Sequence, residues 1–451
     1  MKKYDLIVIG SGPAGEKAAV KAAYFGYKIA LVEKNQEFGG AEVSAVIPSQ
    51  ILRELALCRK TSVKFEDYLE RKKMIVAQRQ QDVEDNLIQH QIDLYRGVAS
   101  FENAHTIKVE GEKQEKICGE YILIATGSYP IHPEGIAFDQ KFIYDTKSIV
   151  DLDHFPESIC VVGASVLGFE FATLFSRLGS KVCFINSKNT VLPFLDQGVI
   201  NGLIEIMKEE KIEVHLEKNV EEAHVENNQV IVTFETGEKE SYGMMLYSCN
   251  RAANTRQMNC EAIGLYHGHK DVIEVDEQFS SSIPHIFAVG DAIGFPSRAS
   301  TSMEQGRIAV SHMFHTKDLE VMAKEIPYII YSLPEIATVG ISEEKAKELK
   351  IEYCVGKAQF DHLTKGRIRR EKYGFLKLIF HKINLKILGV HIIGTDASEL
   401  IHYGTVLVED ENTITQLIGR VFNDPSFHDL YKYAAYDGLG RLSGHKIKSE
   451  D

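Results

Sequence analysis

Short runs of apolar residues, without a single polar side chain, recur along the chain in two similar pairs. Residues 6–9 and 29–32 form the first pair, and residues 159–162 and 182–185 form the second. Such runs predict strands that are buried on both faces, as in a parallel sheet. Residues 16–25, between the first two runs, are rich in alanine and lysine and predict a helix. The pattern therefore indicates repeated strand–helix–strand units.

The first strand of the first pair leads into a glycine-rich turn. Gly10, Gly12 and Gly15 provide a tight turn, room for a pyrophosphate and close packing of the helix on the strand, with the pyrophosphate at the helix N-terminus. Glu33 ends the second strand, where it can accept hydrogen bonds from ribose hydroxyls. The alternative is a purely structural turn with a surface Glu33. The cofactor contacts expected in this region are Gly10, Gly12, Pro13, Ala14, Gly15, Glu33, Lys34 and Gly40.

The second pair carries the same motif at the same spacing, 23 residues from 10 to 33 and from 163 to 186, but with different side chains. Ser165 replaces the middle glycine between Gly163 and Gly168, and Asn186 replaces the acid. A carboxylate at that position would repel the 2′-phosphate of NADP, whereas a neutral Asn186 followed by Lys188 would not. We expect an NAD(P) site at these five residues. A site that has lost its ligand is the other reading.

Composition narrows the possible partners. A chain of 451 residues is long enough for about two to four domains. Its net charge of −13 argues against a nucleic-acid partner. No uncharged apolar run approaches the roughly 18–20 residues of a membrane span, and the glycines from position 10 interrupt the apolar start too early for a secretory signal. We therefore expect a cytosolic protein that does not enter membranes.

Cysteine and histidine spacing does not indicate a metal site. The seven cysteines are scattered without a C-x-x-C pair, which is typical of reduced thiols packed as small apolar groups. The closest histidine groupings, His312 with His315 and His267 with His269, have no cysteine or carboxylate pair beside them. We expect neither a disulfide framework nor a bound metal.

Two further strand ends complete the first nucleotide motif. Residues 121–124 lead into Ala125-Thr126-Gly127, and residues 286–289 lead into Gly290-Asp291. Together with the two fingerprints, these segments resemble the two-dinucleotide-binding flavoproteins, the pyridine nucleotide–disulfide oxidoreductase family. In that family Ala125, Thr126 and Gly127 match the middle motif, and Asp291 matches the acid that contacts the FAD ribityl chain. Gly290 stands beside it.

The resemblance covers nearly the whole chain and implies its architecture. The implied fold class is α/β, with two Rossmann-like dinucleotide-binding domains and a C-terminal α+β dimerisation domain. The implied limits are 1–150 and 273–325 for the FAD domain, 151–272 for the NAD(P) domain and 326–451 for the dimerisation domain. FAD and NAD(P) are the implied cofactors, and a homodimer is the implied assembly.

The thiol relay of the family is missing. Redox-active members carry a cysteine pair shortly after a Gly-Gly, whereas Gly39 to Gln50 contains no cysteine and is one residue short. The family's His-Pro-Thr…Glu near the C-terminus is replaced by Asp424-Pro425-Ser426 and Asp429. Without thiols and an acid/base histidine, disulfide reduction by the usual route is excluded.

One branch of the family, the soluble pyridine nucleotide transhydrogenases, has also lost part of this relay and is similar in several stretches, among them residues 191–197, 291–297 and 437–442. The resemblance implies hydride transfer between NADPH and NAD through FAD, chemistry that belongs to the cofactors themselves. Glu170 matches the residue that meets the nicotinamide. Gln50 replaces a lysine near the flavin ring and is the candidate for tuning flavin reactivity. A flavin-dependent NAD(P)H oxidase or diaphorase, or a nucleotide-binding regulatory protein, are the alternatives.

The C-terminal third has its own pattern. Residues 376–380 and 387–393 predict strands, and residues 398–409 predict a helix. His428 and Asp429 either face the partner subunit's flavin or are solvated residues at a helix start. The Lys- and Glu-rich tail after Gly444 is expected to be disordered.

Overall fold

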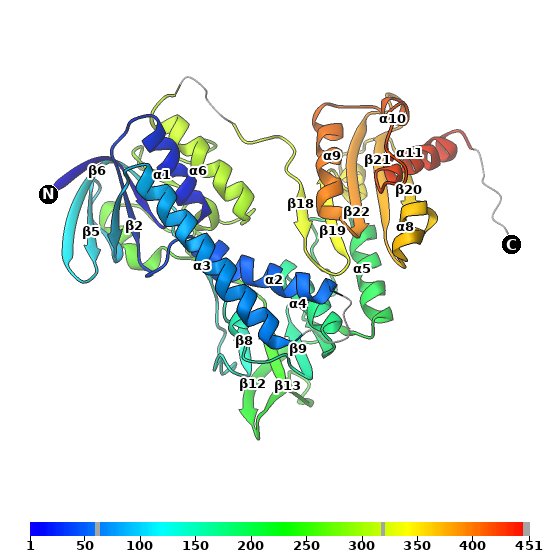
Figure 1. Cartoon of the computed structure of the whole chain (residues 1–451), viewed down its shortest axis with the longest axis horizontal. Coiled ribbons are helices and arrows are strands. Elements are labelled where there is room, and N and C mark those ends of the chain that lie inside the picture. Colours follow the sequence, from blue (N-terminus) through cyan, green and yellow to red (C-terminus); the bar gives the residue numbers. More distant parts are fainter. Residues whose placement is uncertain (59–63, 317–320, 445–451) are drawn as a thin grey trace. The chain divides into compact units, whose positions relative to one another are not determined.

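The computed structural model describes residues 1–58, 64–316 and 321–444 (Figure 1). The chain divides into two compact units. Unit 1 comprises Met1–Pro133, Asp145–His154 and Asn250–Met322, and unit 2 comprises Glu134–Tyr144, Phe155–Cys249 and Ala323–Asp451. The expected tail after Gly444 lies outside the described residues, and the expected limits of the three domains stay a prediction.

Unit 1 is built on a mixed sheet of the order β3-β2-β1-β6-β5-β4, in which β17 also pairs with β6. The strands of that sheet are β1 (Lys2–Ile9), β2 (Ile29–Glu33), β3 (Asp93–Arg96), β4 (Val98–Asn103), β5 (Thr106–Glu110), β6 (Gln114–Ile124) and β17 (Ile286–Ala288), and β7 (Ser128–Pro130) and β16 (Arg251–Ala253) form a separate two-stranded sheet. The α-helices of unit 1 are α1 (Pro13–Tyr24), α2 (Ile47–Leu57), α3 (Phe65–Gln89) and α6 (Ala299–Met313). Its shorter helices are η1 (Glu42–Val46), η2 (Ser148–Asp151), η3 (Arg256–Met258), η4 (Cys260–Ile263), η5 (His269–Asp271) and η6 (Gly290–Ile293).

The parallel part of this sheet has its two faces in separate cores, as the apolar runs predict. Strands β3, β2, β1, β6 and β17 run parallel. Along β1, Leu6 and Val8 belong to one apolar cluster, whereas Ile7 and Ile9 belong to the other. Alternate side chains of a strand point to opposite faces of the sheet, so a run without polar residues must be covered by other apolar elements on both faces. Ala18 of α1, on the first face, is fully buried, which explains the alanine-rich helix.

Unit 2 contains a parallel sheet, an antiparallel sheet beside it and the C-terminal sheet. The first has the order β11-β10-β9-β15-β8, the second β12-β13-β14 and the third β18-β19-β22-β21-β20. The strands are β8 (Ile143–Asp145), β9 (Ser158–Val162), β10 (Lys181–Asn186), β11 (Glu213–Leu216), β12 (Val220–Glu226), β13 (Gln229–Phe234), β14 (Lys239–Tyr242), β15 (Met244–Tyr247), β18 (Tyr328–Ile330), β19 (Glu335–Gly340), β20 (Tyr353–Gln359), β21 (Phe375–His381) and β22 (Ile387–Gly394). The helices are α4 (Val166–Arg177), α5 (Gln197–Glu209), α7 (Glu343–Glu348), η7 (Phe360–His362), α8 (Thr364–Arg369), α9 (Ala397–Glu409), α10 (Ile414–Ile418) and α11 (Asp429–Leu442).

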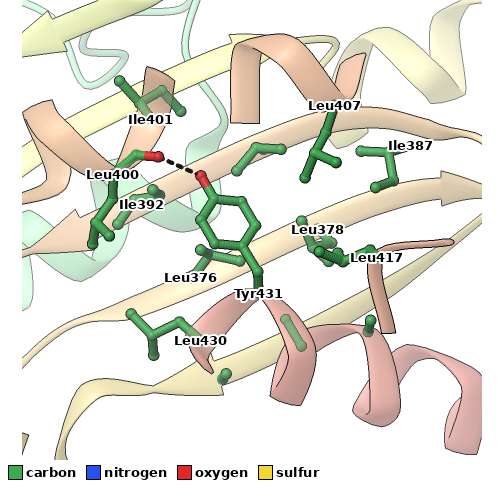
Figure 2. Close-up of a cluster of buried hydrophobic side chains, with 14 of the residues drawn as sticks. Leu376, Leu378, Ile387, Ile392, Leu400, Ile401, Leu407, Leu417, Leu430 and Tyr431 are labelled. Atoms are coloured by element: carbon green, nitrogen blue, oxygen red, sulfur yellow. Dashed lines mark hydrogen bonds between the residues drawn. The ribbon is translucent and has the colours of Figure 1, made fainter. Parts of the chain in front are cut away.

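The C-terminal sheet confirms the two strands and the helix expected there, which are β21, β22 and α9. Its core surrounds Tyr431 of α11, which is fully buried (Figure 2). The Tyr431 hydroxyl donates to the backbone oxygen of Leu400 in α9 at 2.6 Å, so the single polar atom of this side chain is paired. The core thus ties α9 and α11 to the same sheet.

A buried ion pair joins the start of α5 to the C-terminal sheet of unit 2. Lys377 of β21 donates to both carboxylate oxygens of Asp196 at 2.8 Å and also pairs with Glu343. Asp196 is the N-cap of α5, so one carboxylate fixes a helix start and accepts the lysine. Within the described part of the chain, no helix combines the length and the apolar character needed to cross a membrane.

Candidate nucleotide-binding sites

The first glycine turn is dictated by backbone contacts. Gly10 follows β1 with a φ of +104°, and a Cβ atom there would lie 2.4 Å from the backbone oxygen of Ala125. At Gly15 it would lie 1.9 Å from the oxygen of Gly10. At Gly12 a Cβ would meet nothing within 4 Å. Gly10 and Gly15 therefore close the turn itself, whereas Gly12 borders open space.

That open space lies at the start of α1. Gly12 is its N-cap and provides no side-chain cap, and Pro13 and Ala14 form the first helical positions. The first N–H groups of a helix lack intrahelical partners, and they attract anions together with the helix dipole. Gly40 approaches from the other side, because a Cβ there would lie 2.9 Å from the Cα of Gly12. The turn fits a phosphate group.

Glu33 is buried at the end of β2 and already oriented. Its Oε2 accepts from the Ser11 N–H at 2.9 Å and from the Ser11 hydroxyl at 2.6 Å. Its Oε1 accepts from the backbone and side-chain nitrogens of Asn35, both at 2.9 Å. The alternative of a surface Glu33 is wrong, because the residue is 4 % exposed. Lys34, beside it, is exposed.

Ser11 is a contact that sequence reasoning missed. Its hydroxyl donates to Glu33 and accepts from the N–H of Gly39 at 3.1 Å. This bond joins the glycine turn to the Gly39-Gly40 segment, which lies 28 residues further along the chain. A serine between two glycines resembles any turn residue, so no sequence signal marks this role.

A buried polar atom without a partner lies at the end of β6. The hydroxyl of Thr126 has no hydrogen-bond partner among the described residues, although it is inaccessible to solvent. Such atoms are uncommon in folded proteins and indicate a missing ligand or water. Thr126 lies between Ala125, against which Gly10 packs, and Gly127, which has a φ of +71°. Thr126 therefore points to a ligand on this side of the turn.

Asp291 is held by a chain of hydrogen bonds that the sequence did not suggest. The Ser128 hydroxyl donates to Asp291 at 2.7 Å, and the Arg251 Nε donates to Ser128 at 2.9 Å. Burial lowers the pKa of Arg251, while the charges of Asp291 and Asp145 oppose this shift. The neighbouring Gly290 donates its N–H to Gln305 at 2.8 Å. Pairing of β7 with β16 brings Arg251 to Ser128 across more than a hundred residues, which explains why the sequence alone did not reveal it.

The second glycine turn repeats the geometry of the first in unit 2. Gly163 has a φ of +106°, and a Cβ there would lie 2.4 Å from Cys249 Sγ. A Cβ at Gly168 would lie 2.1 Å from the oxygen of Gly163. Gly168, like Gly15, is closed by a backbone oxygen, whereas Gly163 shares the positive φ of Gly10 but faces the side chain of Cys249.

The side chains around the second turn form a different set of bonds. Asn186 Oδ1 accepts from the Ala164 N–H at 3.0 Å, the counterpart of the Ser11–Glu33 bond, and its Nδ2 donates to the oxygen of Lys188 at 2.7 Å. Ser165 caps α4, because its hydroxyl accepts from the Gly168 N–H at 3.0 Å. The Lys188 side chain is exposed. Asn186 thus has the position of Glu33 without its charge.

Glu170, expected to meet the nicotinamide, is engaged within unit 2. This residue of α4 is buried, and its Oε1 accepts from the Tyr331 N–H at 2.9 Å. One turn later, the Thr173 hydroxyl accepts from the Leu333 N–H at 3.0 Å. The two bonds fix α4 to the segment after β18.

Gln50 lies half-buried in α2, and its side chain has no hydrogen-bond partner among the residues described here. The π-helical turn Glu42–Val46 precedes α2 where the thiol relay is absent. Arg79 holds this turn through Glu42 at 3.3 Å and reaches the buried Glu16 at 3.1 Å. Charged pairs therefore fix the segment that carries no cysteines.

His428 and Asp429 lie at the start of α11, as one of the two readings expected. His428 is not fully solvated, because its ring lies among those of Tyr403, Phe422 and Tyr431. Burial lowers the pKa of His428, and burial together with Asp424 raises the pKa of Asp429. Whether the pair meets a partner subunit's flavin stays a prediction.

Comparison with known proteins decides the family. The model named pyridine nucleotide-disulphide oxidoreductase matches residues 4–306, and the dimerisation domain of the same family matches residues 326–435. The chain belongs to the pyridine nucleotide-disulphide oxidoreductase family. Membership confirms the expected α/β fold class with a C-terminal dimerisation domain and makes the chain an oxidoreductase whose cofactors are FAD and NAD(P).

Relatives in this family match almost end to end. The soluble pyridine nucleotide transhydrogenase of Mycobacterium tuberculosis (strain ATCC 25177 / H37Ra) is 35% identical over 461 residues, 98% of each chain. That of Pectobacterium atrosepticum is 34% identical over 459 residues, 97% of this chain and 98% of its own. The resemblance expected from the sequence is thereby confirmed.

Two solved structures have the same fold. The Cu(II) complex of the HOCl-induced flavoprotein disulfide reductase RclA from Escherichia coli has a TM-score of 0.91 at 25% identity, over 97% of this chain and 99% of that one. LpdA from Mycobacterium tuberculosis has a TM-score of 0.89 at 22% identity, over 97% and 99%, and shows the fold alone.

The residues of the first site fit FAD. The uncapped start of α1, the open space at Gly12 and the unpaired Thr126 hydroxyl are features that an occupant with phosphate and polar groups would satisfy. Asp291, with its hydrogen-bond support, offers acceptors to hydroxyl groups. The dimerisation domain indicates a homodimer.

Proposed function

We propose that the protein transfers hydride from NADPH to NAD through bound FAD, as a transhydrogenase. The relatives from Mycobacterium tuberculosis and Pectobacterium atrosepticum carry that name and match 97–98% of the chain. The mechanism requires one exchangeable site that accepts both nucleotides in turn and a resident cofactor that stores the hydride between them.

Asn186 carries the proposal. It makes the bond to Ala164 that Glu33 makes to Ser11, so its side chain has the ribose position of a dinucleotide fold. A carboxylate there favours NAD and repels the 2′-phosphate of NADP, whereas an amide accepts either ribose. The exposed Lys188 adds a positive charge two residues further on. A site with this chemistry can exchange NADPH for NAD.

In the first site, bound FAD supplies the two-electron chemistry that accepts hydride from one nucleotide and returns it to another. The N-terminus of α1 at Gly12 and Pro13 binds the pyrophosphate, and Glu33 accepts from the adenosine ribose. Thr126 and Asp291 hold the remaining polar groups. Gln50 tunes the reactivity of the ring as an uncharged hydrogen-bond donor, and Glu170 meets the nicotinamide.

The absence of the relay supports transfer between nucleotides over disulfide reduction. The segment from Gly39 to Gln50 holds no cysteine, and Asp424 stands in the place of the family histidine. Glu42 of that segment forms a charged pair with Arg79 of α3, and this pair offers no electron carrier. The hydride can then leave only to a second nucleotide or to an external acceptor.

The test is an anaerobic titration of the purified protein. NADPH is expected to bleach the flavin absorbance, and thio-NAD is expected to restore it with formation of one thio-NADH per flavin. Bleaching that only oxygen or a quinone reverses would replace the proposal with an oxidase or diaphorase. A protein that binds the nucleotides without bleaching would be a regulatory protein.

The proposal includes the oligomeric state of the protein. We expect a homodimer, which light scattering coupled to size exclusion measures as twice the chain mass of 50.7 kDa. A cytosolic location, without a nucleic-acid or membrane partner, stays a prediction from the sequence.

A further inference from the structure

Three potential metal ligands lie together at the edge of the parallel sheet of unit 2. Cys183, Glu213 and His215 each place one donor atom, a thiol sulfur, a carboxylate oxygen and a ring nitrogen, within 4.8 Å of the other two. Among the residues that the structure describes, no second group of three such side chains satisfies this distance. Sequence reasoning did not detect this group, because its residues are spread over positions 183 to 215.

Strand pairing brings the three side chains to one face. Cys183 of β10 and Glu213 of β11 are direct partners in the parallel register. His215 follows Glu213 by two residues, and residues two apart in a strand share a face. Neighbouring strands lie about 4.8 Å apart, so the sheet ladder itself sets the spacing of the donors.

The distances suit a small tetrahedral ion. Bonds of about 2.0–2.3 Å to zinc separate tetrahedral ligands by about 3.3–3.7 Å, so the donors must approach by roughly 1 Å. Glu213 and His215 can make this movement, because Glu213 is exposed, His215 is half-buried, and their Oε2 and Nε2 atoms lie 4.0 Å apart. Cys183 is buried and provides the fixed point.

The donor types select the kind of ion. A thiolate and an imidazole with one carboxylate suit Zn²⁺ and similar transition metals, whereas Mg²⁺ and Ca²⁺ require mostly oxygen ligands. Lys218, the nearby cation, is paired with Glu240 at 2.6 Å and Glu238 at 3.2 Å, so its charge is compensated. Cys160, the register partner of Cys183, is buried on β9, on the side of β10 away from β11, and its thiol interacts with that of Cys183.

We propose that Cys183, Glu213 and His215 bind one Zn²⁺ ion, with water at a fourth position. The ion joins β10 to β11 and is independent of flavin and of the proposed hydride transfer. β10 ends at Asn186, three residues after Cys183, so the ion stiffens the strand that presents the ribose contact.

The experiment uses the full-length flavin-loaded protein with any histidine tag removed, since a tag binds the same ion. Isothermal titration with ZnCl₂ is expected to give one ion per chain. Cys183→Ser and His215→Ala are each expected to weaken binding by more than about 100-fold, because even outer-shell changes cost about 10- to 100-fold. With CoCl₂, tetrahedral d–d bands are expected at wavelengths beyond the flavin absorbance, and Cys183→Ser is expected to remove them.

Matched controls separate the site from general effects. Cys118→Ser and His224→Ala change a cysteine of β6 and an exposed histidine of β12, and both are expected to bind Zn²⁺ as the unaltered chain does. His215→Ala alters a half-buried side chain, so it remains informative if Cys183→Ser fails to fold. Absence of stoichiometric binding, equal affinity in His215→Ala, or an octahedral cobalt spectrum would overturn the proposal.

Discussion

The two glycine turns have the same backbone geometry but differ in the side chains beside the nucleotide position, where Ser165 replaces Gly12 and Asn186 replaces Glu33. Gly10 and Gly163, like Gly15 and Gly168, have no room for a Cβ atom. Gly12 borders open space and is replaced by Ser165 in the second turn. Positions that close the turn are therefore retained, and positions that meet a ligand are free to change. The glycines that close the turn are therefore needed for folding, whereas the other positions determine which ligand binds.

The largest effect is expected where the backbone closes on itself. Gly10→Ala places a Cβ 2.4 Å from the Ala125 oxygen at a positive φ and is expected to lower the free energy of unfolding by about 3 kcal/mol or more. Gly12→Ala has space and a φ of −63°, so its cost is expected to stay within about 1 kcal/mol while flavin content falls. Urea denaturation and the flavin-to-protein absorbance ratio measure both. Equal stability of the two variants would contradict the distinction between glycines that close the turn and a glycine that borders the ligand.

Glu33→Ala is expected to have the next largest effect. Removal of the carboxylate leaves the buried Ser11 N–H unpaired, which costs about 1–3 kcal/mol, and also removes the ribose contact. The purified variant should therefore contain less flavin and unfold at lower urea. Asn186→Ala, the matched change in the second turn, is expected to leave flavin content unchanged. Full flavin content in Glu33→Ala would contradict the ribose assignment.

A change of nucleotide preference is expected at the second turn. Asn186→Glu restores the carboxylate of the first turn beside the 2′-phosphate and is expected to raise the KM for NADPH about tenfold or more, equivalent to about 1.4 kcal/mol, with little change for NADH. Lys188→Glu is expected to act in the same direction. Lys181→Glu, at the exposed start of the same strand, is the control. An equal rise in the KM for NADPH and for NADH would show that neither residue 186 nor residue 188 contacts the 2′-phosphate.

The smallest effect is expected from Ser165→Ala. Loss of the N-cap of α4 is expected to lower the free energy of unfolding by about 1 kcal/mol. Saturating NADP should reduce this difference, since a bound phosphate takes the place of the cap at the helix start. Denaturation with and without NADP measures it. If NADP leaves this difference in the free energy of unfolding unchanged, Ser165 caps the helix without taking part in the nucleotide site.

Short-range pattern was sufficient to predict the strands and the glycine turns. Runs such as residues 6–9 require burial on both sides, and the turn that follows them requires glycine, so both can be recognised locally. The strands around residues 376–380 and 387–393 follow from the same argument.

Contacts that depend on strand pairing could not be predicted from the sequence. Arg251 reaches Ser128 through the β7–β16 pair, and Cys183 meets Glu213 through the register of β10 and β11. Nothing local distinguishes these residues from other polar positions near strand ends. Ser11 was missed for a different reason, because its hydroxyl acts through Glu33 and Gly39, which lie far along the chain.

The two helix starts also imply different residence times for their occupants. The first N–H groups of α1 receive no side-chain cap, whereas α4 carries its own in Ser165. An empty first site leaves those donors to solvent, so the protein gains stability when the site is filled. In the second helix one of these donors, the Gly168 N–H, is paired with Ser165 without any ligand, so departure of a nucleotide leaves fewer donors to solvent. The Ser165 hydroxyl thus suits the second site to a nucleotide that is exchanged, whereas the uncapped first site suits a cofactor that stays bound.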